Sequence, residues 1–224
     1  MKIISVTLAQ TLKAVRPSHG FGYLPDAVRA VVDRYKFVEF PTEPHELLPT
    51  DPNQAINFRH GKLELTTGVL IIDQLQVYQT GLVVHTSTST TDSDLIVDDV
   101  LHWASSHFQI SFEPIRPVGH LSQLEVRFEK RIADFFPALK AVGSGMSKGL
   151  DDFWEFHPAY ELTSLIFSFD PSVHPSPAPS FFKIEPRVNV AFEENIYFSE
   201  APLSTKNHAT LLERFERVCL ETAK

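Results

Sequence analysis

Hydrophobic positions along this chain change their spacing twice in the same way, from every second residue to every third or fourth. In the first passage, alternating runs at 69–79 and 82–87 are followed by a helical stripe over 92–107. In the second, runs at 181–185 and 189–198 precede a stripe close to the end of the chain. Since a period of two indicates a strand and a period near 3.6 an amphipathic helix, each passage predicts a β-hairpin that leads into a helix.

Local residue signals support both predicted helices and the first hairpin. Gly81 can adopt the positive φ that a tight turn between two strands requires. Thr91 and Asp94 stand at capping-box spacing at the start of the 92–107 helix, whose apolar face includes Trp103. The last helix has its own apolar stripe, formed by Leu211, Leu212, Phe215, Val218 and Cys219.

These elements predict an α+β fold, with a mostly antiparallel sheet and helices packed on one face. The repeated order of elements allows two similar halves, 1–110 and 120–224, which meet near 109–122 or together form one intimate domain. The alternative is that no duplication occurred, because antiparallel α+β proteins commonly reuse a hairpin followed by a helix.

Charge and composition narrow the range of partners. The formal net charge is -8 over 224 residues, which argues against a general nucleic-acid binder and against an anionic membrane surface. The same charge suits a basic protein surface. No run reaches the roughly 18 apolar residues of a membrane span. With Cys219 as its single cysteine, the chain forms no intrachain disulfide, and a cytoplasmic protein is expected.

The first candidate site is polar and lies on the predicted 92–107 helix. Asp98 and His102 are four residues apart, a spacing that can present two metal ligands on one helix face, and Asp99 adds a carboxylate. A metal site needs three or four converging ligands, and the zinc-binding sequence patterns are missing. We therefore expect a solvated polar face here, with no bound metal.

The second candidate site is the glycine-rich segment that begins at Gly143. It resembles a phosphate-binding loop, but its spacing is wrong and it follows a helix rather than a strand. The segment is predicted to be a flexible loop that gates a pocket or grips a partner. The binding candidates within it are Gly143, Ser144, Gly145, Met146 and Lys148.

The sequence predicts a binding protein more readily than an enzyme. It shows no nucleophile-and-base spacing and no cofactor motif, so neither a catalytic residue nor a cofactor is assigned. The leading hypothesis is a non-catalytic protein-binding or assembly module whose partner is another protein or a second copy of the chain. The alternative hypothesis is a small-molecule-binding protein or hydrolase with a pocket between the two halves.

Overall fold

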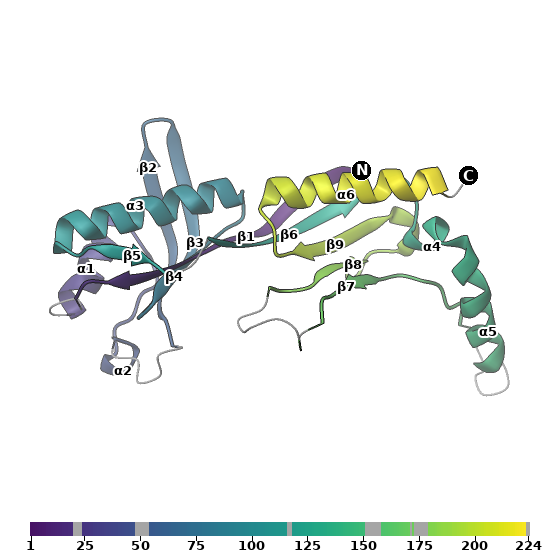
Figure 1. The fold of residues 1–224 in the computed structure, drawn as a ribbon, viewed down its shortest axis with the longest axis horizontal. Coiled ribbons are helices and arrows are strands. Elements are labelled where there is room, and N and C mark those ends of the chain that lie inside the picture. The colour runs from purple at the N-terminus through teal and green to yellow at the C-terminus, as the bar shows by residue number, and fades with distance from the viewer. Residues whose placement is uncertain are drawn as a thin grey trace. The chain divides into compact units, whose positions relative to one another are not determined.

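A computed structural model of the protein describes residues 1–19, 24–47, 54–115, 118–150, 158–170, 172 and 179–222. These residues form an α+β fold with one large antiparallel sheet, as predicted (Figure 1). The strand order is β2-β3-β4-β1-β6-β9-β8-β7, with β5 paired to β1. The strands are β1 (Lys2–Pro17), β2 (Ile56–Leu65), β3 (Gly68–Tyr78), β4 (Gly81–Thr86), β5 (Phe112–Pro114), β6 (Gly119–Arg127), β7 (Leu165–Phe167), β8 (Phe182–Pro186) and β9 (Ile196–Ala201).

Two long helices each follow directly after a pair of antiparallel strands. They are α3 (Thr90–Phe108), after β3 and β4, and α6 (Thr205–Thr222), after β8 and β9. The shorter helices are α1 (Leu24–Tyr35), α2 (Pro44–Leu47), α4 (Ile132–Phe135) and α5 (Lys140–Leu150). Single 3-10 turns occur at Pro137–Leu139 and Phe192–Glu194.

The chain divides into two compact units that are interleaved in sequence. The N-terminal unit contains residues 6–122 and 203–205, and the C-terminal unit contains residues 1–5, 123–202 and 206–224. Each unit repeats one order of elements: a strand, helical segments, three strands joined in antiparallel pairs, and a long helix. Both units thus share one order of elements, and the duplication itself stays a prediction.

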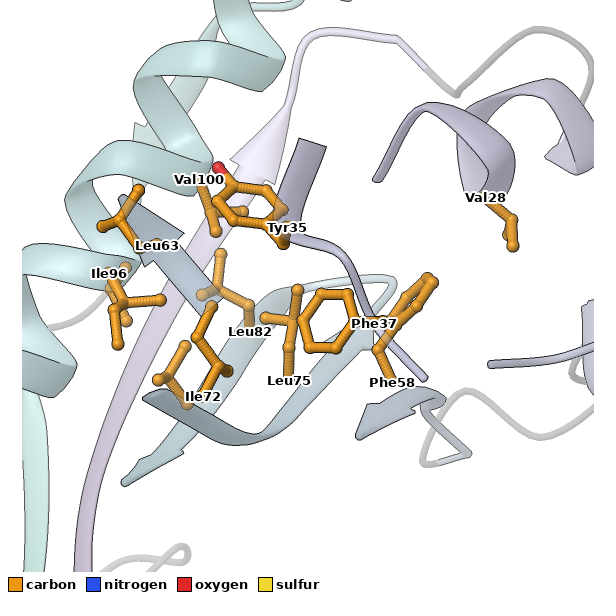
Figure 2. Close-up of a cluster of buried hydrophobic side chains, with 12 residues drawn as sticks. Val28, Tyr35, Phe37, Phe58, Leu63, Ile72, Leu75, Leu82, Ile96 and Val100 are labelled. Atoms are coloured by element: carbon orange, nitrogen blue, oxygen red, sulfur yellow. The ribbon is translucent and has the colours of Figure 1, made fainter. Parts of the chain in front are cut away.

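The core of the N-terminal unit lies between α3 and one face of its strands (Figure 2). Leu75, Val84 and Thr11 are cross-strand neighbours on β3, β4 and β1, and each is fully buried. Ile96 and Val100 of α3 pack into this layer, as the helical stripe predicted. Trp103 is only partly buried, at the edge of the core.

The first hairpin and its helix match the prediction, except that the helix begins earlier. Gly81 has φ +153 in the turn, and an added Cβ there would overlap the carbonyl oxygen of Lys13. The N-cap of α3 is Ser89 rather than Thr91, because Ser89 has the extended backbone that a cap requires. Its hydroxyl accepts from the amide of Asp92 at 3.1 Å, so the capping pair is Ser89 with Asp92.

In the C-terminal unit, the buried face of α6 carries two polar residues that interrupt the predicted stripe. His208 and Glu216 are 0% and 4% exposed, whereas the predicted stripe residue Val218 is 48% exposed. Leu212 and Cys219 are buried, as predicted. The helix therefore turns His208 and Glu216, rather than Val218, toward the interior, where both side chains have polar partners.

The prediction of a flexible loop from Gly143 onward is wrong, since these residues belong to α5. Three glycines favour a loop, but the helix packs against the chain near Tyr160, where a larger side chain at position 143 would overlap the Tyr160 carbonyl oxygen. Ser147 accepts a hydrogen bond from the Tyr160 amide at 3.1 Å. Close backbone approach therefore compensates for weak helix propensity. The proline-rich stretch at 171–180, whose composition favours a surface loop, lies largely outside the described residues.

Candidate functional site

The face of the N-terminal sheet opposite α3 carries a row of polar side chains. The row crosses four paired strands, from Arg59 on β2 through Gln74 and His85 to Gln10 on β1. Each of these residues alternates with one that points into the core, because successive side chains on a strand face opposite sides. A second row starts at Asn57 and continues through Gln76 on β3.

A polar hollow of about 610 Å³ opens where these rows reach β2. We call it the amide hollow, because amide side chains from two neighbouring strands form its floor. It is lined by Glu39, Phe40, Pro41, Glu46, Gln54, Ala55, Asn57, Arg59, Gln74 and Gln76. Every lining residue belongs to the N-terminal unit.

Asn57 organises the floor of the amide hollow. Its Oδ1 accepts hydrogen bonds from Nε2 of Gln74 at 3.1 Å and from Nε2 of Gln76 at 3.0 Å. Its own Nδ2 donates to the carbonyl oxygen of Ala55 at 3.0 Å. The three amide side chains thus form a fixed group, anchored to the backbone at one point.

The rim of the hollow includes a loose ionic group around Glu39. The carboxylate lies 3.8 Å from Arg59 Nη1 and 3.7 Å from His60 Nε2. The backbone of Glu39 pairs with Arg59 in an isolated antiparallel bridge, which holds this segment beside β2. Because the Glu39 and Arg59 side chains are 57% and 56% exposed, water screens their attraction.

His85 lies in the polar row next to Gln74 and brings a buried ring nitrogen to this face. Its Nε2 is shielded from solvent and makes no hydrogen bond to the described part of the chain. Burial lowers the pKa of His85, while the nearby Asp73 carboxylate opposes that shift. Burial therefore favours the neutral ring at this point of the polar row, outside the lining of the hollow.

The three α3 candidates from the sequence are not brought together as one site. Asp99 accepts two hydrogen bonds from Arg34 Nη2, both at 2.9 Å, and one from the Tyr35 hydroxyl at 2.7 Å. Asp98 is 71% exposed and lies 3.9 Å from Lys13 Nζ. His102 is exposed. Asp99 therefore joins α1 to α3, while Asp98 and His102 belong to a solvated face.

The five candidates from the glycine-rich segment all lie on α5. Gly143 is buried, whereas Ser144, Gly145, Met146 and Lys148 are exposed. Met146 shares the open side of the helix with Val142, and the two side chains are 51% and 60% exposed. The segment thus presents a helix to solvent, and its binding role stays a prediction.

The amide hollow was not predicted from the sequence, although one sequence signal for it is present. Gln74 and Gln76 alternate with Leu75 and Val77, so β3 has one fully polar side near this end. The matching polar residue on β2 is Asn57, which lies 17 and 19 positions away from these two glutamines in sequence, and only the strand pairing joins them. Alternating amides on adjacent predicted strands would have been the signal.

Neither a family model nor a curated protein matches this chain. Among the described helices, none has the length and apolar character to cross a membrane. Within the same described part of the chain, no three metal-ligating side chains gather at one point.

Proposed function

We propose that this protein is a non-catalytic protein-binding module, and that its binding surface is the amide hollow with the adjoining polar row. The observation that carries the proposal is the fixed group of Asn57, Gln74 and Gln76, which lines an open hollow on paired strands. Side-chain amides both donate and accept hydrogen bonds, so they match the peptide groups of an extended polypeptide segment.

The rigidity of this surface supports binding. The floor residues lie on paired strands, and the Asn57 hydrogen bonds favour one arrangement of the glutamine side chains in the free protein. Preorganised groups lose less conformational entropy on association, which favours affinity from a small contact area. Phe40, 41% exposed at the edge of the hollow, offers an apolar surface beside the amides.

The proposal is tested by displaying short peptides of varied sequence on an array and probing them with the labelled full chain. We expect a reproducible set of bound peptides, and loss of most of that set with Gln76→Leu. The matched control is Gln79→Leu, which makes the same chemical change at an exposed turn residue outside the hollow. A set of bound peptides that is identical for both variants contradicts the proposed surface. Absence of any binding contradicts the proposed function.

A further inference from the structure

The orientation of the amide groups in the hollow follows from one backbone atom. The Ala55 carbonyl oxygen can only accept, so the Asn57 atom that faces it must be the donor Nδ2. The opposite atom of that side chain, Oδ1, must then face the two glutamines. Since Oδ1 can only accept, both glutamines must turn their Nε2 groups toward it. Reversing any one of the three amides would place two acceptors or two donors against each other.

This orientation decides which chemical groups of the glutamines remain for a ligand. With Nε2 of Gln74 and Gln76 bound to Asn57, their carbonyl oxygens Oε1 are the groups turned away from that contact. The carboxylates of Glu39 and Glu46 line the same hollow, and Glu46 Oε2 already accepts from the Thr42 and Glu43 amides. Arg59 is the one cationic side chain among the described lining residues, so their summed formal charge is negative.

We propose that the amide hollow binds the guanidinium group of an arginine side chain on a basic protein segment, an inference that rests on the proposed function. A planar guanidinium carries five donors and no acceptor, which complements the glutamine carbonyl oxygens on β3 and the Glu39 carboxylate in the same lining. The ammonium of lysine offers its donors from a single point and fits a spread set of acceptors less well. The chain's formal net charge of -8 also attracts basic segments at long range.

Arg59 acts as an internal competitor for this arginine. Its guanidinium lies 3.8 Å from Glu39, too far for a direct hydrogen bond, and both side chains are more than half exposed. The side chain can therefore swing aside at little cost when another cation enters. If Arg59 were part of the binding machinery for an acidic ligand, its removal would weaken binding. For an incoming arginine, its removal should strengthen binding.

The test uses isothermal titration of the full chain with a short peptide containing two arginines and with the same peptide carrying citrulline at both places. Citrulline keeps the shape of arginine but is neutral and exchanges one donor group for an oxygen. We expect the arginine peptide to bind at least about tenfold more tightly than the citrulline peptide, because hydrogen bonds that involve a charged group are stronger than neutral ones. We expect Glu39→Gln to weaken binding of the arginine peptide and Arg59→Gln to strengthen it.

Glu64→Gln is the matched control for loss of a carboxylate, because Glu64 is on the same strand as Arg59, outside the hollow, where it pairs with Lys62 at 2.7 Å. Equal affinity of the two peptides overturns the inference, as does an equal effect of Glu39→Gln and Glu64→Gln. Array peptides that need Gln76 but lack basic residues would overturn the inference while leaving the proposed function standing. Failure of every array peptide would overturn both.

Discussion

The two units differ in the side chains on the sheet face that the long helix of each unit leaves uncovered. In the C-terminal unit this face is charged, and its carboxylates pair within the unit: Glu185 with Lys183 at 3.2 Å, and Glu125 with Arg187 at 3.6 Å. In the N-terminal unit, Gln74 and Gln76 occupy this face, and their hydrogen bonds to Asn57 turn the glutamine carbonyl oxygens away from that contact. The same order of elements therefore gives one face whose carboxylates pair with cations of their own unit and one that carries the amide hollow, the surface proposed above to bind a partner.

The helix-covered sides also differ. α3 is held by an apolar stripe and by buried neutral polar contacts, in which the Ser93 hydroxyl donates to the Ala9 carbonyl oxygen at 2.8 Å. Its ion pair through Asp99 lies at the margin, where the side chain is 26% exposed. α6 instead carries two ionisable side chains, His208 and Glu216, in the interior. Because the stability of a fold depends on the protonation state of its buried ionisable groups, the C-terminal unit should be the more sensitive to pH.

The largest expected effect is on Glu216. Its carboxylate contacts the Met1 amino group and accepts from the Glu129 amide at 2.7 Å, while remaining 4% exposed. Glu216→Ala removes both contacts and should lower the free energy of unfolding by about 3–5 kcal/mol, as breaking a buried ion pair does. Urea unfolding of the variant measures this. Glu213→Ala, at an exposed position of the same helix, should stay within about 0.5 kcal/mol.

A nearly equal loss from Glu213→Ala and Glu216→Ala would contradict the interior contacts assigned to α6. Glu216→Gln separates the two contacts, because it keeps an acceptor for the Glu129 amide but removes the charge opposite Met1. Its cost should lie between those of the other two variants.

The second prediction concerns pH and His208. Burial lowers its pKa from 6.5 to about 4, and Nε2 lies 2.9 Å from the Ser199 hydroxyl. The Ser199 hydroxyl donates to the Lys183 carbonyl at 2.8 Å, so a neutral His208 can donate to Ser199. In the unfolded chain the ring gains its proton near pH 6.5, but the folded chain resists that until about pH 4. Stability should therefore fall as pH decreases through this window.

The loss over that window should be about 3 kcal/mol, because one pKa unit corresponds to about 1.4 kcal/mol. Thermal unfolding at closely spaced pH values measures it, with His208→Gln removing this share of the slope. His102→Gln is the matched control, since His102 is exposed, and should leave the slope unchanged. The prediction fails if the wild-type and His208→Gln curves run parallel between pH 6.5 and 4.

The third prediction compares two adjacent carboxylates of α3. Asp99→Asn weakens three charge-assisted hydrogen bonds from Arg34 and Tyr35 and should cost about 1–2 kcal/mol. Asp98→Asn, at a side chain 71% exposed, should change stability by less than about 0.5 kcal/mol. Urea midpoints at matched pH give both values. Similar costs for the two would mean that Asp99 is not the link between α1 and α3.

Sequence patterns predicted the elements whose residues interact locally and missed those defined by distant contacts. The alternation of apolar residues in β3 and β4 and the apolar stripe of α3 were sufficient to predict these elements, because each pattern reflects one buried face. His208 and Glu216 were missed because polar residues on a buried stripe have no local sign of their partners. The amide hollow was missed for a related reason, since Glu39, Asn57 and Gln76 meet only through strand pairing.

The smallest expected effect separates two glycines of α5, the segment that sequence composition assigned to a loop. Gly145 has open space around its Cα, so Gly145→Ala should gain up to about 1 kcal/mol from better helix propensity. Gly143→Ala makes the same change where the new methyl group would overlap the Tyr160 carbonyl oxygen, so it should destabilise the protein instead. Amide hydrogen exchange of α5 reads both changes locally, with slower exchange in Gly145→Ala and faster exchange in Gly143→Ala. Faster exchange in both variants would show that α5 owes its stability to contacts along its whole length rather than to the close approach at Gly143.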